Sequence, residues 1–203
     1  MKTPIPGGFL VAVEGIDGTG KSTVAAATPR RQAASRVEAK KAVAQFIGKP
    51  LRNNDSFTAI LSGNSLAKML SKSAIHKSVN QKSHLAAVAN ADQLFVNATR
   101  EESKSDRAGD ANIAAIHRYF APMLFGEEVL LVKFTVKEIT TAPNLLYTIE
   151  TLKIEKPDRS SSKNEVERVD DTEAARQTFQ SGFSKPLQQK IEAVKKEMDQ
   201  KHL

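Results

Sequence analysis

The feature of this sequence that most limits its possible folds is a set of three apolar segments that follow one another closely in the second half of the chain. They cover residues 116–125, 129–139 and 145–155 and are rich in β-branched and aromatic side chains. The connections between them, 126–128 and 140–144, are too short for the crossover that two parallel strands need. The sequence therefore predicts an antiparallel meander in this region.

Helical patterns dominate the chain before these strands. The clearest is a stripe of apolar residues at helical spacing from His84 to Ala98, with Ser83 before it as a suitable N-cap. The other expected elements are a helix over 31–47, a short strand over 57–61, a short helix over 64–70 and a polar loop over 101–112. Helices followed by a meander predict an α+β fold, in which N-terminal helices pack on a small antiparallel sheet of three or more strands.

The composition changes after the last predicted strand. Residues 157–171 are rich in Ser, Lys, Asp and Glu, which is typical of a linker. Beyond them Leu187, Ile191, Val194 and Met198 recur at helical spacing, which predicts an amphipathic helix for packing or self-association. The pattern does not decide the oligomeric state. The expected organisation is a leader over 1–28, an α+β domain over 29–156, and a polar linker with a helix over 157–203.

Composition and charge exclude several classes of protein. There is no cysteine, which excludes a disulfide framework, and the acids and histidines lack the paired spacing of metal ligands, so no metal site is expected. No apolar run approaches roughly 18 residues, so we expect a cytoplasmic protein with no membrane partner.

The net charge is +7, and seven basic residues stand against two acids between Pro29 and Asp55. This favours nucleic acid as a partner, RNA more than DNA, or a partner protein; a solvated helical face is the alternative.

The start of the chain carries a phosphate-binding loop. The segment from Gly15 to Thr23 matches the pattern G-x-x-x-x-G-K-[ST] and lies between an apolar strand and the start of a helix. With Glu14 before it, the segment resembles the opening of a thymidylate kinase. The resemblance implies a parallel sheet that holds the loop, with ATP and Mg²⁺ as cofactors. The nucleotide-binding residues that it implies are Gly15, Asp17, Gly18, Gly20, Lys21, Ser22 and Thr23.

The chain after residue 28 does not continue such a kinase. The later sequence has no apolar strand that ends in a magnesium-binding acid, no arginine-rich lid and no series of parallel β-α units. The pair Asp106-Arg107 is of the kind found in a kinase substrate motif, but no strand is predicted before it. Two interpretations stay open: a nucleoside monophosphate kinase, or an acquired or vestigial leader on a different domain, which the antiparallel strands favour.

The body of the chain, over residues 38–156, contains several separated motifs. They read Lys49-Pro50-Leu51-Arg52-Asn53, Ser71-Lys72-Ser73-Ala74, His84-Leu85, Ile116-His117-Arg118-Tyr119-Phe120-Ala121-Pro122, Val132-Lys133-Phe134-Thr135-Val136-Lys137-Glu138 and Leu146-Tyr147-Thr148-Ile149-Glu150. In this order they resemble the third type of large polyvalent protein-associated domain, which occurs in long multidomain proteins of phages and conjugative elements. The resemblance implies a mobile-element context and leaves the biochemical activity open.

One strand of the meander offers groups that could hold phosphate. Alternation over 129–139 puts Lys133, Thr135 and Lys137 on the face opposite the apolar residues, so two cations flank a hydroxyl at repeats of about 7 Å. Such a spacing suits adjacent phosphate oxygens. Because neighbours in a strand point to opposite sides, the preceding strand can add either His117 or Arg118 to this face, and the register decides which.

His84 is a further candidate, since a helix N-terminus lowers the pKa of an imidazole and favours the neutral form of a general base. The predicted site comprises His84, His117, Arg118, Lys133, Thr135 and Lys137. Together they suggest a metal-independent ribonuclease without a cofactor, in which a histidine removes the 2′-OH proton and cations stabilise the phosphorane. The order of elements is similar to that of barnase, EndoU and RelE-like nucleases. The alternative is a non-catalytic docking module, whose lysines serve solubility and whose histidines make structural hydrogen bonds.

Overall fold

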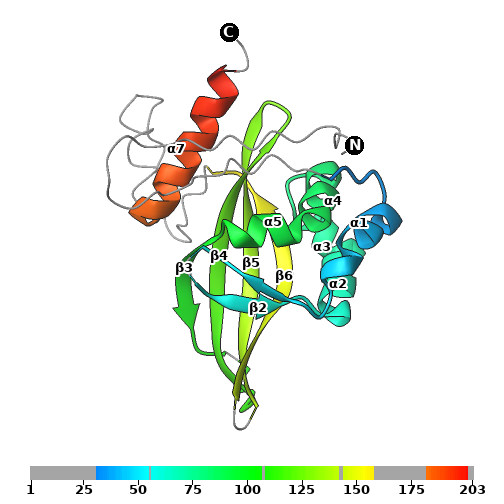
Figure 1. The fold of residues 1–203 in the computed structure, drawn as a ribbon, viewed down its shortest axis with the longest axis vertical. Helices are drawn as coiled ribbons and strands as arrows, with labels where there is room; N and C mark the ends of the chain where they lie inside the picture. Colours follow the sequence, from blue (N-terminus) through cyan, green and yellow to red (C-terminus); the bar gives the residue numbers. More distant parts are fainter. Residues whose placement is uncertain (1–30, 55, 107, 142–143, 158–181, 201–203) are drawn as a thin grey trace, which may run out of the picture.

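The computed structural model describes residues 31–54, 56–106, 108–141, 144–157 and 182–200. Within them the chain has the predicted α+β architecture, with helices on both sides of a curled sheet (Figure 1). The predicted leader over 1–28 and nearly all of the predicted linker over 157–171 lie outside the described residues.

A serine N-cap precedes each of the first three α-helices. Ser35, Ser62 and Ser71 cap α1, α2 and α3, and each side chain accepts a hydrogen bond from a backbone N–H three residues later. The helical elements are α1 (Arg36–Val43), η1 (Ala44–Phe46), α2 (Gly63–Met69), α3 (Lys72–His76), α4 (Gln81–Ala89), α5 (Ala91–Val96) and α7 (Lys185–Gln200). The strands are β1 (Pro50–Arg52), β2 (Thr58–Ile60), β3 (Thr99–Lys104), β4 (Ile113–Phe125), β5 (Glu128–Thr141) and β6 (Asn144–Glu155).

The sheet has six strands in the order β1–β2–β6–β5–β4–β3. Strands β4, β5 and β6 form the predicted antiparallel meander, and β3 extends it at the edge of the sheet. Gly126, with a φ of 63°, allows the tight turn between β4 and β5. The prediction of a small, purely antiparallel sheet is wrong, because β2 pairs in parallel with β6 through Ile60 and Thr148. Four helices and three strands separate β2 from β6 along the chain, which is ample for the crossover of a parallel pair.

The edge strand β3 was not expected. It occupies Thr99–Lys104, at the start of the predicted polar loop over 101–112. Edge strands commonly carry charged residues, which disfavour pairing with other chains. The apolar alternation that identifies a central strand is therefore missing from this segment.

The single helix predicted over 84–98 is divided into α4 and α5, which meet at Asn90. The Asn90 side chain binds the backbone of Arg31: its Nδ2 donates to the carbonyl oxygen at 2.8 Å and its Oδ1 accepts from the N–H at 2.9 Å. Asn90 Nδ2 also donates to the Ala86 carbonyl oxygen, four residues earlier, at 2.8 Å, and such local side-chain bonds compete with the regular helix. The N-cap of α4 is Asn80 rather than Ser83, and Asn80 Oδ1 accepts from the Ser83 N–H at 2.8 Å.

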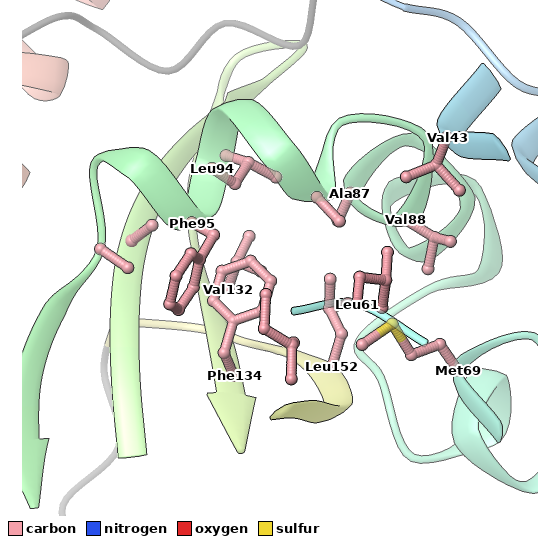
Figure 2. Close-up of a cluster of buried hydrophobic side chains, with 14 of the residues drawn as sticks. Val43, Leu61, Met69, Ala87, Val88, Leu94, Phe95, Val132, Phe134 and Leu152 are labelled. Carbon is pink, nitrogen blue, oxygen red and sulfur yellow. The ribbon is translucent and has the colours of Figure 1, made fainter. Parts of the chain in front are cut away.

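The main core lies between the helices α1 to α5 and one face of the sheet (Figure 2). Alternate residues of β5, namely Val132, Phe134 and Val136, are fully buried on this face. The ring of Phe95 from α5 meets the ring of Phe134 edge-on, with centroids 5.7 Å apart. We call this side of the sheet the helix-covered face.

The C-terminal helix α7 packs on the opposite face of the sheet, as Figure 1 shows. Leu187 and Ile191 of α7 lie against Phe120 and Leu131 of the sheet. The amphipathic pattern at the end of the chain therefore serves packing within the same chain. α7 covers the end of this face near the β4–β5 turn, and the polar residues of the face lie further along the strands.

Candidate functional site

The register of β4 and β5 decides which predicted residues share a face. Arg118 lies opposite Thr135 and His117 lies opposite Val136, whose side chain belongs to the main core. Arg118 therefore joins Lys133, Thr135 and Lys137 on the face opposite the helices, and His117 points to the helix-covered face. β6 adds Lys153, which lies opposite Lys133. We call Arg118, Lys133, Thr135, Lys137 and Lys153 the cationic face.

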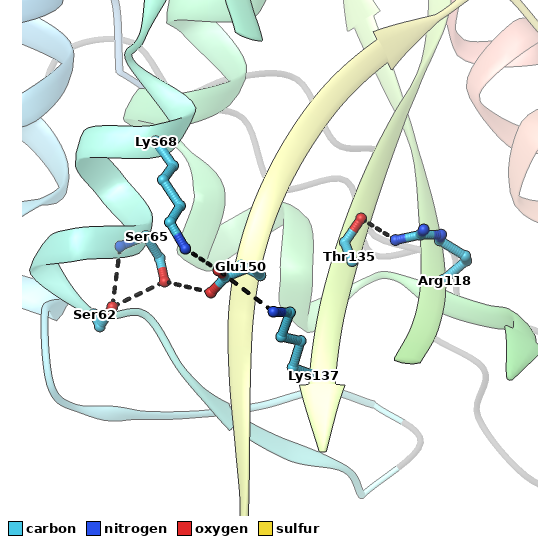
Figure 3. A network of polar contacts seen from close by, with 7 residues as sticks. All are labelled: Ser62, Ser65, Lys68, Arg118, Thr135, Lys137 and Glu150. Carbon is cyan, nitrogen blue, oxygen red and sulfur yellow. Dashed lines mark hydrogen bonds and ion pairs between the residues drawn. The ribbon is translucent and has the colours of Figure 1, made fainter. Parts of the chain in front are cut away.

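Hydrogen bonds and a ring contact hold side chains of the cationic face in place. Figure 3 shows the Arg118–Thr135 and Lys137–Glu150 contacts. Arg118 Nη1 donates to Thr135 Oγ1 across the two strands. Lys133 Nζ lies 5.5 Å from the centre of the Phe120 ring, and partial burial lowers the pKa of its ammonium group. The side chains of Lys133, Lys137 and Lys153 are between 28% and 32% exposed, so each is partly desolvated and still accessible.

Carboxylates lie among these cations. Glu102 of β3 lies opposite Arg118, and its charge also acts on Lys133. Glu155 and Glu150 are each shared by two lysines. Glu155 Oε1 is 3.7 Å from Lys133 Nζ and 3.0 Å from Lys153 Nζ. Glu150 binds Lys68 of α2 and also lies 4.0 Å from Lys137 Nζ. Because the cations outnumber these carboxylates, the surface retains positive charge for a ligand.

His84 lies far from the cationic face, in the helical layer. Its side chain is fully buried in the second turn of α4, where Nε2 is 2.8 Å from the Met69 carbonyl oxygen and Nδ1 is 2.7 Å from Ser78 Oγ. A carbonyl can only accept, so Nε2 carries the hydrogen. Burial lowers the pKa of His84, and the hydrogen bond to the Met69 carbonyl oxygen opposes this shift. The contacts fit a structural histidine that joins α2, the α3–α4 connection and α4.

His117 is 5% exposed and lies on the helix-covered face, beside Phe57. Its Nδ1 is 2.8 Å from Ser103 Oγ and its Nε2 is 3.0 Å from Glu138 Oε2. The structure therefore brings together Arg118, Lys133, Thr135 and Lys137 but places both histidines elsewhere. The sequence pattern does not identify Ser103 and Glu138 as partners of His117. The polar residues around Ser103 predict a loop, and only the strand register brings Glu138 next to this histidine.

The predicted nucleotide-binding residues, Gly15 to Thr23, lie outside the described residues, so the phosphate-binding loop stays a prediction. Over the part of the chain that the structure describes, no group of three or more His, Asp or Glu residues could hold a metal ion. None of the helices described there is both long and apolar enough to span a membrane.

Comparison with known protein families assigns the chain to one of them. Residues 30–147 match the large polyvalent protein-associated domain 3, and this match spans more than half of the sequence. The chain belongs to this family. Comparison with curated proteins and with solved structures gave no match. In this large polyvalent protein-associated domain 3, the matched residues contain the helices α1 to α5 and the strands β1 to β5, and the match ends at Tyr147 within β6.

Four members of the cationic face, Arg118, Lys133, Thr135 and Lys137, lie within the residues that match the family. The last part of β6 lies beyond the match and supplies Lys153 and its partner Glu155. The cationic face of this large polyvalent protein-associated domain 3 is thus built from both the matched residues and the strand that completes the meander.

Proposed function

We propose that this chain is a nucleic-acid-binding accessory domain of a phage or mobile-element protein, and that it docks single-stranded RNA on the cationic face. The observation that carries the proposal is the β4–β5 register, which gathers Arg118, Lys133, Thr135 and Lys137 on one side of the sheet. RNA is preferred to DNA because the Thr135 hydroxyl can exchange hydrogen bonds with a ribose 2′-OH.

The geometry suits a phosphate backbone. Alternate residues of β5 present an ammonium group, a hydroxyl and a second ammonium group at repeats of about 7 Å. The Arg118 guanidinium can donate two parallel hydrogen bonds to one phosphate. Partial burial of Lys133 lowers the local dielectric and strengthens its attraction for an anion. A partly desolvated row of cations binds an extended strand more readily than a compact ligand.

Binding is better supported than cleavage. A metal-independent ribonuclease needs a general base on the same surface as the cations, and His84 and His117 both lie elsewhere. The proposal therefore assigns these cations to docking.

The test measures binding of a short, labelled, single-stranded RNA by fluorescence anisotropy over a range of salt concentrations. The double variant Lys133→Ala/Lys137→Ala should bind about tenfold more weakly. The negative slope of log K against the logarithm of the salt concentration should become less steep by about 1.4, because two phosphate contacts are lost. The matched control is Lys72→Ala/Lys82→Ala, which removes two exposed lysines from helices.

An equal loss of affinity in both double variants would show that total charge matters rather than the cationic face. Absence of RNA and DNA binding by the wild-type chain would leave an acidic partner protein as the ligand. The same samples, run on a denaturing gel with excess chelator, reveal any RNA cleavage.

A second candidate function rests on the motif from Gly15 to Thr23, which has the residues and spacing of an ATP-binding loop. If the leader is functional, calorimetric titration with ATP and Mg²⁺ should show binding by the wild type and at least about tenfold weaker binding by Lys21→Ala, because the lysine contacts the terminal phosphates. Lys2→Ala is the control. Equal, negligible heat in all three proteins identifies the leader as vestigial.

A further inference from the structure

A second cluster of reactive groups lies on the helix-covered face, apart from the cationic face. Ser103 of β3, His117 of β4 and Glu138 of β5 form a continuous chain of hydrogen bonds across three strands. Ser103 Oγ is 2.8 Å from His117 Nδ1, and His117 Nε2 is 3.0 Å from Glu138 Oε2. A hydroxyl, an imidazole and a carboxylate in this order are the parts of an activated serine nucleophile.

The direction of the hydrogen bonds follows from the chemistry of the groups. An ionised carboxylate can only accept, so the hydrogen lies on Nε2 of His117 and points to Glu138. In the neutral imidazole Nδ1 is then the acceptor and takes its hydrogen bond from the Ser103 hydroxyl. Glu138 therefore holds the ring in the tautomer that can remove a proton from Ser103.

The fold leaves the serine accessible while it encloses the base. Ser103 is exposed on the edge strand β3, whereas His117 is 5% exposed and lies against the rings of Phe57 and Tyr147, with centroids 6.0 and 6.1 Å away. Such an arrangement allows a ligand to reach Ser103 Oγ and keeps bulk water away from the imidazole.

A β-bulge in β3 places the cation Arg100 on the same face of the sheet as Ser103. The pairing of β3 with β4 shifts between Arg100 and Glu102, so Arg100 lies opposite Tyr119 and Ser103 lies opposite His117. In a regular strand two residues three positions apart point to opposite faces, and the bulge puts Arg100 and Ser103 on the same face. Arg100 can thus face negative charge that develops on a group bound at Ser103.

Tyr147 supports the carboxylate from the neighbouring strand. Its hydroxyl makes a hydrogen bond to Glu138, and partial burial together with the Glu138 charge raises the pKa of Tyr147. The phenol therefore stays protonated and donates to Glu138, which fixes the carboxylate that orients His117.

We propose that Ser103 is the nucleophile of an ester-hydrolysing site, with His117 as its general base and Glu138 as the residue that positions His117. Ser103 Oγ attacks the carbonyl carbon of a carboxylic ester while its proton passes to His117 Nδ1, and the carbonyl electrons move to the oxygen, which Arg100 faces. When this intermediate collapses, the bond to the alcohol breaks and His117 returns the proton to the leaving oxygen. Water then attacks the acyl group on Ser103 by the same sequence, with release of a carboxylic acid.

The test uses a fluorophosphonate probe on the intact chain. Ser103 Oγ attacks phosphorus, the P–F bond breaks, fluoride leaves and His117 takes the proton, so the serine gains a stable phosphonyl group. Mass spectrometry of the intact protein and of its peptides should locate this group on Ser103. Ser103→Ala should abolish labelling, and the matched control Ser105→Ala, an exposed serine just beyond β3, should label at the wild-type rate.

The role of the base is tested by rate. His117→Gln should slow labelling at least about 100-fold, the usual contribution of a general base, and Glu138→Gln should slow it by a smaller factor. Far-ultraviolet circular dichroism checks that each variant is folded; if His117→Gln is not, Glu138→Gln supplies the comparison. Absence of labelling in the folded wild type, a label on Tyr147 or another residue, or unchanged rates in the folded variants would each overturn the proposal.

Discussion

Replacement of Phe134 by alanine is expected to lower the free energy of unfolding by about 4 kcal/mol, the largest effect on stability that we predict for a single residue. Phe134 is fully buried on the central strand β5 and meets the ring of Phe95 edge-on, at the junction of the sheet with α5 (Figure 2). The substitution removes most of an aromatic side chain from a packed interior and leaves a cavity that the rigid sheet cannot close.

The measurement is equilibrium unfolding in urea, followed by far-ultraviolet circular dichroism. Val37→Ala is the control, because Val37 is 77% exposed on α1 and its truncation should change stability by less than about 0.5 kcal/mol. A loss below about 1 kcal/mol for Phe134→Ala would mean that the helices do not pack on this face of the sheet as described.

Replacement of His84 by alanine should cost about 3 kcal/mol at pH 7.5. The change removes a fully buried ring and leaves the Met69 carbonyl oxygen without the donor that lies 2.8 Å from it. It also releases Ser78, whose Oγ accepts from the Ile154 N–H at 3.0 Å and so joins the helical layer to β6. The control is His76→Ala, because His76 is exposed at the end of α3 and contributes little packing.

The pH dependence gives a second measurement on the same variant. Burial lowers the pKa of His84 in the folded chain below its value of about 6.5 in the unfolded chain. The unfolded chain therefore binds the proton first as the pH falls, so the stabilisation by His84 is complete above about pH 6.5 and declines below it, by at most about 1.4 kcal/mol per pH unit. The difference in stability between wild type and His84→Ala should accordingly shrink as the pH falls from 7.5 towards 5. A constant difference over this range would show that His84 titrates alike in both states.

The structure separates residues that the sequence groups into one predicted site. His84 and His117 have both ring nitrogens bonded within the fold, whereas the cations of β5 remain partly exposed. The residue types that suggested one catalytic site therefore serve at least three places: the helical layer, the cationic face and the cluster around Ser103. Each place has its own test, so RNA binding and ester hydrolysis can succeed or fail independently.

The sequence by itself determined the α+β class, the meander of β4, β5 and β6 and the amphipathic helix α7, because these depend on hydrophobic periodicity and short connections, which are local properties of the chain. Tertiary structure alone decided the parallel pairing of β2 with β6 and the bonds that join Asn90 to Arg31, since both are contacts between residues far apart in the chain. The division of the predicted site has the same origin. A shift of one residue in strand register exchanges the faces of His117 and Arg118, and no local pattern specifies that register before the strands pair.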